Sequence, residues 1–238
     1  MLHILIGVIA ISVAVVGGGA QADQSGALGQ LARNPAGVIL LWVIVVGLVA
    51  LGLWQVVQTI LVPGPDPKRG WLHRIGDLGK AVIYIAVAFT AFIFAHGGTT
   101  SSSQSSKTFS AKLLSAPGGV VVLVIVGLGV VAIGGFFVFL GLSRHFTKGI
   151  RVPPAPVGTA VVALGITGYI AKGVAVAVVG ILFVVAAVTL DPSTGSGLDG
   201  ALKTLAALPF GQIILVLVGI GLIAYGIYCG ARALLARL

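Results

Sequence analysis

The sequence predicts an all-α membrane protein with six transmembrane helices, arranged as three parallel two-helix repeats around a pseudo-threefold axis normal to the membrane. Composition is the first reason. The chain of 238 residues is 58% hydrophobic and 8% charged, and its mean hydropathy is +1.17, so little polar surface is left for water. The second reason is that several apolar runs exceed the roughly 18 residues that mark a spanning helix. The third is an internal triplication.

The triplication is anchored by Pro35, Pro117 and Pro209, each followed at fixed offsets by three glycines and an aromatic residue. The glycines are Gly37, Gly119 and Gly211, then Gly47, Gly129 and Gly221, then Gly52, Gly134 and Gly226, and the aromatic residues are Trp54, Phe136 and Tyr228. Because proline and aromatic residues are scarce in this chain, chance does not explain their alignment. The pattern indicates one helical pair present in three copies.

Six apolar segments supply the expected helices: 2–17, 36–61, 72–95, 120–146, 159–190 and 213–235. Backbone groups in hydrocarbon must bond within their own segment, and no segment alternates with the period of a barrel strand, so helices are expected. The second helix of each repeat should start near its proline, which lacks the N–H that a first turn leaves unpaired. The repeats then cover residues 1–61, 72–146 and 157–238 of one compact transmembrane domain.

A short, mildly apolar stretch precedes each of the three prolines, at 27–32, 111–115 and 201–207. These stretches are typical of short helices at the outer interface of the membrane. For the middle repeat a plain loop is an equal alternative, because serine dominates there. The polar tract at 97–106 is typical of a flexible linker.

Lysine and arginine are concentrated in alternate connections, which predicts the orientation. One set comprises Lys68, Arg69 and Arg74, then Arg144, Lys148 and Arg151, then Arg232 and Arg237, whereas the other connections hold only Arg33, Lys107, Lys112 and Lys203. By the positive-inside rule the first set and the C-terminus face the cytoplasm, so all repeats cross the membrane in the same sense. The net charge is +9, and the first six of these residues are candidates for anionic lipid headgroups. Nucleic-acid binding is not expected, because the charges are spread over short loops.

The first repeat is expected to be N-terminally incomplete. Aligning the first helices places 76–82 opposite 168–174 and Gly7 opposite Gly180. The counterpart of the Gly-x-x-x-Lys element would then precede the first residue, so either the natural chain begins earlier or this repeat has lost its entry turn. A competing interpretation makes residues 1–22 a cleaved signal peptide, but no Lys or Arg precedes the apolar core and the segment fills a position in the repeat.

Side chains that carry chemistry are few and scattered. The chain has five aspartates and no glutamate, and Asp77 is the sole carboxylate expected near the membrane. The four histidines form no i, i+4 pair, and Cys229 is the only cysteine, so a metal cluster and an internal disulfide are not expected. Paired-carboxylate catalysis and a phosphate-binding loop also lack their residues. The sequence therefore predicts no enzyme activity, no cofactor and no metal.

Lys80 and Lys172 occupy equivalent positions near the expected cytoplasmic ends of the third and fifth helices. An ionisable group within a spanning segment is a functional-site hypothesis, because an unpaired charge there costs several kcal/mol. Alternatively, each lysine snorkels to water or lipid phosphate. Asp77, three residues before Lys80, can also pair with it on the same helix face.

Glycines recur every seven residues in the second helices: Gly127, Gly134 and Gly141, then Gly219 and Gly226, with Gly52 in the first repeat. Seven residues are nearly two helical turns, so each series lines one face and lets another backbone approach closely. These glycines, the three prolines and Gly47, Gly129 and Gly221 are therefore expected to pack helices between repeats. A smooth lining around a central cavity, or a docking face for a foreign helix, is the alternative.

Motifs in all three repeats point to a family. The chain has Gly-x-x-x-Lys-Gly at 168–173, Gly-Ala-Leu-x-x-Leu-Ala at 26–32 and 200–206, and a Pro-x-Gly before each glycine-rich second helix. In these features it resembles the actinobacterial membrane proteins grouped as domain of unknown function 1206, over essentially its whole length. The resemblance is weakest at 110–113 and implies an inner-membrane protein with six helices, without an activity. Mitochondrial carriers share three hairpins, but their acidic gate motif is absent.

Two function classes remain. The first is a non-catalytic accessory or scaffold subunit of a larger respiratory or envelope complex, with anionic lipids and other integral membrane subunits as its partners. The second is a small transporter or lipid-binding channel with a central cavity between the repeats. The second lacks an evident polar site at mid-membrane depth.

Overall fold

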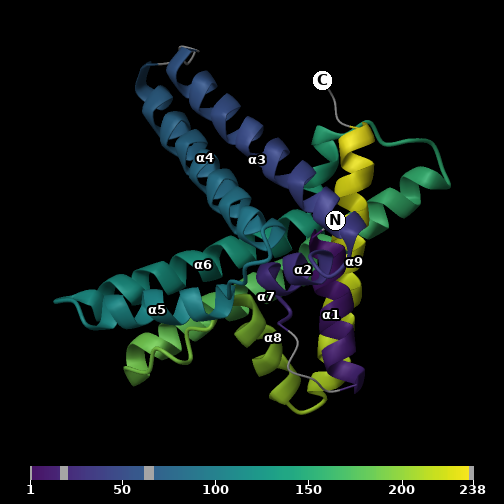
Figure 1. Ribbon diagram of the computed structural model, residues 1–238. Helices are drawn as coiled ribbons and strands as arrows, with labels where there is room; N and C mark the ends of the chain where they lie inside the picture. Colours follow the sequence, from purple (N-terminus) through teal and green to yellow (C-terminus); the bar gives the residue numbers. More distant parts are fainter. Residues whose placement is uncertain (1, 17–20, 62–66, 236–238) are drawn as a thin grey trace. The chain divides into compact units, whose positions relative to one another are not determined.

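The structure is a computed structural model that describes residues 2–16, 21–61 and 67–235, with side chains omitted at 61, 67–75, 77 and 148. These residues form helices (Figure 1), as expected for the all-α class. The elements are α1 (Leu2–Val16), α2 (Gln24–Leu31), α3 (Pro35–Leu61), α4 (Pro67–Ala95), α5 (Ser102–Leu114), α6 (Gly119–Leu142), the 3₁₀ helix η1 (His145–Gly149), α7 (Val157–Thr189), α8 (Gly197–Ala207) and α9 (Gly211–Leu235).

Five of the described helices, α3, α4, α6, α7 and α9, are long and apolar enough to cross a membrane. The sixth expected span corresponds to α1, which is apolar but has 15 residues. These apolar helices support the prediction of a membrane protein, whereas the sixth crossing stays a prediction. The prolines lie where expected, because α3 begins at Pro35 and α6 and α9 begin two residues after Pro117 and Pro209.

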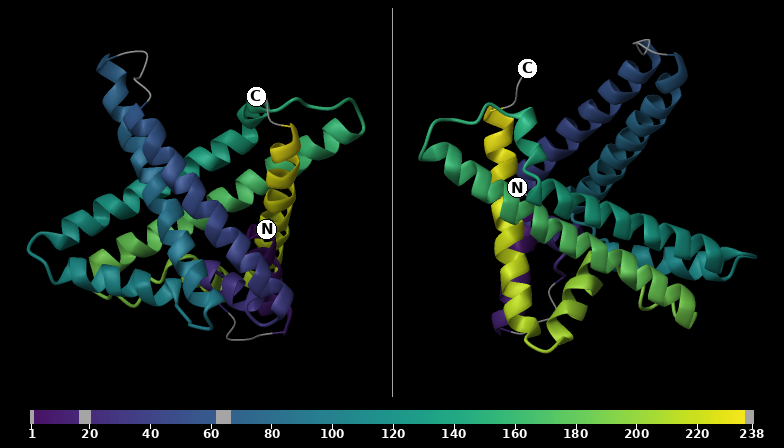
Figure 2. Two further views of the ribbon diagram at one scale, coloured as in Figure 1. Left: turned by 45° about the horizontal axis from the view of Figure 1, so that its top comes forward. Right: turned by 180° about the vertical axis from the view of Figure 1, so that it is seen from behind.

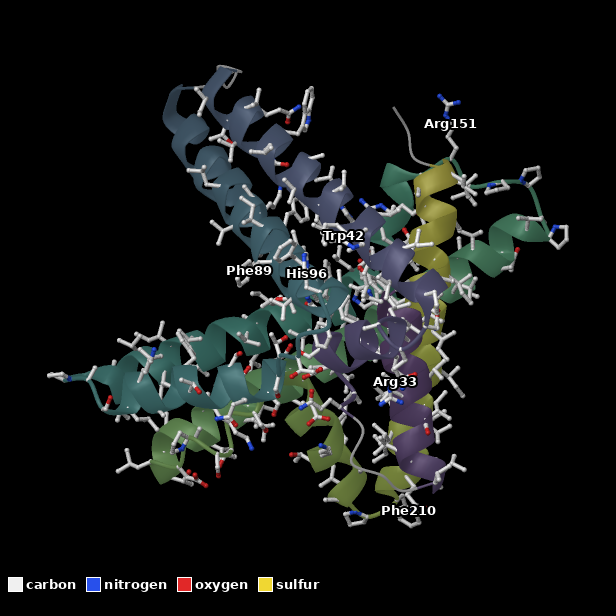
Figure 3. All side chains as sticks on the ribbon, in the orientation of Figure 1. Arg33, Trp42, Phe89, His96, Arg151 and Phe210 are labelled. Carbon is white, nitrogen blue, oxygen red and sulfur yellow. The ribbon has the colours of Figure 1, made fainter. Side chains whose placement is uncertain are left out.

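Contacts between residues group the chain into two compact units, Met1–Ala27 with Ser101–Leu238, and Leu28–Thr100. The single compact domain expected from the sequence therefore stays a prediction. In the second unit, α3 packs along α4. Trp42 of α3 meets His96, whose ring centroid lies 5.1 Å away (Figure 3). These rings join the N-terminal part of α3 to the residue that directly follows α4.

In the first unit, α6 packs along α7, α1 along α9 and α7 against α9 (Figure 2). Glycines make the close contacts between these helices. A Cβ added to Gly134 would lie 2.7 Å from the carbonyl oxygen of Gly173, and one added to Gly219 would lie 2.9 Å from that of Gly7. The pairs α3–α4, α6–α7 and α9–α1 each join the second helix of one repeat to the first helix of another.

The prediction that the fourth apolar helix reaches residue 146 was wrong. The α-helix ends at Leu142, and Phe146 belongs to η1. Arg144 stops the helix because it adopts the left-handed conformation, with φ of 53°, which cannot continue a right-handed helix.

The prediction of a flexible linker at 97–106 was also wrong at its C-terminal end, where α5 begins at Ser102. The hydroxyl of Ser101 accepts a hydrogen bond from the N–H of Gln104 at 3.2 Å. Serine is a preferred N-cap because its side chain satisfies an amide of the first turn. The serines therefore start a helix, and each expected outer stretch proves helical.

Candidate functional site

Lys172 lies near the middle of α7, a helix of 33 residues. At 1.5 Å per residue, its Cα is roughly 22 Å along the axis from Val157. The whole of α7 is apolar enough to cross a membrane. Lys172 is therefore farther from the helix end than the sequence analysis expected.

The ammonium group of Lys172 contacts two neighbouring helices. It donates a hydrogen bond to the hydroxyl of Tyr225 on α9 at 3.0 Å. It also lies 4.4 Å from the ring centroids of Phe137 on α6 and of Tyr225. Cation–π contacts of this kind contribute about 0.5–2 kcal/mol. Among the described side chains, no carboxylate lies within ion-pair distance of Lys172.

An aromatic cluster continues from Tyr225 along the same helices. Tyr169 lies next to Tyr225, with ring centroids 5.3 Å apart, and stacks on Phe146 at 5.1 Å. Phe146 also meets Tyr228 edge-on at 5.2 Å. The hydroxyl of Tyr228 is buried, and none of the described residues forms a hydrogen bond with it. The left-handed turn at Arg144 thus brings η1 back over α7 and α9. Phe146 of η1 then adds a ring to the aromatic cluster.

Small residues of α7 make room for these rings. A Cβ added to Gly165 would lie 2.5 Å from Cζ of the Phe146 ring, and one added to Gly168 would lie 2.6 Å from the Cα of Tyr225. Gly173, beside Lys172, meets the backbone of Gly134 on α6. The glycines of α7 therefore set both the closeness of the helices and the position of the aromatic cluster.

Helix α1 closes another side of the site. The ring of His3 meets Tyr225 edge-on, with centroids 4.9 Å apart. One turn beyond Lys172, Ala175 is buried with Ile6 and Ala10 of α1. Helices of all three repeats, α1, α6 and α7 with α9, thus surround Lys172.

The other predicted charged residues are placed only in part. Lys80 is exposed on α4, in the second unit, and the side chain of Asp77 lies outside the described residues. Of the six headgroup candidates, Arg144 and Arg151 are exposed, whereas the side chains of Lys68, Arg69, Arg74 and Lys148 also lie outside the described residues.

The predicted packing glycines fall into two groups. Close neighbours surround Gly52, Gly127, Gly134, Gly141, Gly219, Gly221 and Gly226. In contrast, no described atom lies within 4 Å of a Cβ added to Gly47 or Gly129. Every glycine of the seven-residue series is therefore packed against a neighbour, whereas of Gly47, Gly129 and Gly221 only Gly221 is.

The sequence analysis did not predict a buried polar cluster where the N-terminal ends of α2, α5 and α8 meet. Asp199 is 4% exposed. Its carboxylate accepts hydrogen bonds from the N–H of Ala22 at 3.0 Å and from Lys203 at 2.8 Å. The hydroxyl of Ser25 accepts a hydrogen bond from the N–H of Ser102 at 2.8 Å. These contacts tie the three short helices together.

Asp23 is the most enclosed carboxylate of this cluster, at 2% exposed. Its Oδ1 accepts a hydrogen bond from the N–H of Gly26 at 3.0 Å, whereas its buried Oδ2 has no hydrogen-bond partner among the described residues. Burial raises the pKa of Asp23 above its ordinary value, and the nearby charge of Asp199 acts in the same direction. The available signal in the sequence was that Asp23 directly precedes a short helix and Asp199 falls in the first turn of another, where a negative charge is favourable.

The comparisons with known proteins agree with three repeats. The family model described as Domain of Unknown Function (DUF1206) matches residues 1–61, 75–144 and 167–236. Over 239 residues the chain is 34% identical to "Uncharacterized protein YxxB" from Bacillus subtilis (strain 168), covering 94% of this chain and 82% of the relative. Because that bacterium is not an actinobacterium, the expected restriction to actinobacteria is not supported. No solved structure matches the chain.

Proposed function

We propose that this chain, which belongs to the family described as Domain of Unknown Function (DUF1206), is a non-catalytic integral membrane accessory or scaffold subunit. It would belong to a larger respiratory or envelope complex and contact lipids and partner helices. The family description supplies no activity, so the proposal is argued from the geometry. The observation that carries it is the set of contacts around Lys172.

In the described chain, the ammonium of Lys172 is held by a hydroxyl and two ring faces. These groups are neutral, whereas a lysine in an apolar span is best balanced by an anion. The hydroxyl of Tyr225 accepts from Lys172 and keeps its own proton, with which it can donate to a further acceptor. A carboxylate on a spanning helix of a partner subunit would satisfy both groups, so Lys172 and Tyr225 together would recognise it.

The surrounding helices provide surface for such a partner and for lipid. Large apolar side chains are exposed along α6, among them Ile125, Phe136 and Phe139. The face of α6 that carries Gly127 and Gly134 is packed on α7. Because one face of α6 is used within the chain, the other is free to contact lipid tails or another protein.

The finer architecture is part of this proposal. Six spans around a pseudo-threefold axis would place each second helix against the first helix of the next repeat. The equivalent pairs α3–α4, α6–α7 and α9–α1 support such an arrangement. The bias of lysine and arginine supports a bacterial inner membrane with the C-terminus in the cytoplasm.

A small transporter or lipid-binding channel is the second candidate. The position of Lys172 near the middle of a spanning helix favours it, because intramembrane charges often mark substrate pathways. In this case the anion would be a transported solute. The backbone contact between Gly134 and Gly173 argues against a passage between α6 and α7.

Gentle-detergent affinity purification distinguishes the two candidates. The wild-type protein is expected to retain an integral membrane subunit in fixed stoichiometry, and Lys172→Met is expected to lose it at least tenfold. Lys172→Arg keeps the charge and should retain more of the subunit. Recovery of the wild-type protein alone as a monomer, with solute flux after reconstitution into liposomes, would instead support transport.

A further inference from the structure

A groove of about 370 Å³ lies where α6 ends and α7 begins. Its lining includes Arg144, Val152, Pro153, Thr159, Ala163 and Ile166. The lining is therefore apolar except for one guanidinium group and one hydroxyl. The groove borders the aromatic cluster, because Val162 and Ile166 of its lining also pack against the hydrophobic cluster that contains Phe146. The lining does not include Lys172 or the aromatic rings.

The backbone of Arg144 is fixed by its own turn. Its carbonyl oxygen accepts hydrogen bonds from the N–H of Thr147 at 3.0 Å and from the hydroxyl of the same residue at 2.9 Å. Its N–H is directed to the carbonyl of Gly141 at 3.4 Å. In the part of the chain that the structure describes, no carboxylate forms an ion pair with Arg144. A cation is thus held at the groove without an internal counter-ion.

The apolar wall of the groove follows α7. Thr159, Ala163 and Ile166 recur at intervals of four and three residues, so they line one face of the helix. That face starts in the first turn of α7 and continues into its apolar length. The groove therefore joins a charged end, at the helix boundary, to an apolar strip that follows a spanning helix.

We propose that this groove binds one anionic phospholipid. The phosphate would bind the guanidinium of Arg144 and the hydroxyl of Thr159, and an acyl chain would lie along Ala163 and Ile166. Arginine suits this role because its planar fork matches the oxygens of a phosphate. The inference deepens the proposed function, because it rests on the proposed contact with lipids and on the cytoplasmic position of this connection.

The test is native mass spectrometry of the purified protein after exchange into mixed vesicles of phosphatidylglycerol and phosphatidylcholine. The wild-type protein is expected to retain one phosphatidylglycerol in preference to phosphatidylcholine. Arg144→Gln should reduce that retention at least tenfold, and Ala163→Trp should reduce it by filling the groove. Lys112→Gln is the matched control, because Lys112 is an exposed cation on α5 that is neither in the groove nor among the headgroup candidates. It should retain the lipid.

Equal losses in Arg144→Gln and Lys112→Gln would overturn the proposal, because they would indicate diffuse attraction to the positive charge of the protein. Equal retention of the two lipids by the wild-type protein, or unchanged retention in Ala163→Trp, would overturn it too. Circular dichroism and thermal unfolding check that each variant is folded. The assay needs no partner subunit, so its outcome is independent of whether the accessory role is correct.

Discussion

Gly134 and Gly173 bring α6 and α7 together backbone to backbone, since a Cβ on Gly134 would lie 2.7 Å from the carbonyl oxygen of Gly173. Membrane helices associate without a hydrophobic driving force, so close packing of small residues matters more than in water. Gly127 with Gly180, and Gly7 with Gly219, form similar contacts. The glycine series therefore joins helices of different repeats.

Gly134→Ala is expected to destabilise the protein by about 1–3 kcal/mol, because the added methyl has no room and the helices must separate. Gly135→Ala is the matched control on the next residue, where no described atom lies within 4 Å of an added Cβ. Thermal unfolding in detergent compares the two. Equal effects would show that α6 and α7 do not meet at Gly134.

Asp23→Asn is expected to make the protein more stable than wild type at neutral pH. Because burial raises the pKa of Asp23, the folded state binds the proton more tightly than the unfolded state does. The wild-type protein should therefore gain stability as the pH falls through the raised pKa toward the ordinary value of 3.8. Unfolding measured between about pH 4 and 8 tests this, and Asp23→Asn should lack that gain.

The control for Asp23 is Asp191, an exposed residue whose pKa has the opposite shift. Hydrogen bonds from Ser193 lower the pKa of Asp191. The hydrogen bonds of the ionised Asp191 contribute stability at a pH above the ordinary pKa of an aspartate. That contribution is lost as the pH falls through the lowered pKa of Asp191. Asp191→Asn should therefore not raise stability at neutral pH. A gain in both variants would point to net charge rather than to burial of Asp23.

Tyr225→Phe and Tyr228→Phe should have different effects, although both tyrosines are buried in α9. Tyr225→Phe leaves Lys172 without its hydrogen bond, which is expected to lower stability by about 1–3 kcal/mol and weaken retention of a partner. Tyr228→Phe removes a buried hydroxyl that lacks a partner among the described residues, so it should be neutral or stabilising. Unfolding and co-purification measure both effects. A larger loss in Tyr228→Phe would contradict the site.

Much of the fold could be predicted because its determinants are local. Apolar runs mark the long helices, and Pro35 marks the start of α3. The period of seven residues identified Gly127, Gly134 and Gly141 as a face against another helix. The sequence did not reveal that Arg144 adopts a left-handed conformation, because any residue other than glycine is uncommon there.

The candidate site was less predictable because its residues come from separate helices. Lys172 was singled out as an intramembrane charge, but its neighbours Phe137, Tyr225 and His3 lie on α6, α9 and α1. Asp199 reaches an amide that lies 177 residues away in the chain. Such contacts depend on how helices pack, which a single sequence does not reveal.

Photocrosslinking beside Lys172 tests the proposed accessory role most directly. A benzoylphenylalanine replaces Phe137, whose ring lies 4.4 Å from the ammonium, and the matched control replaces Phe136, which is exposed on the same helix. In intact cells the first is expected to crosslink to a spanning segment that contains an Asp or Glu, and Lys172→Met should abolish that product. Adducts to lipid alone, or an identical product with and without Lys172, would contradict the account.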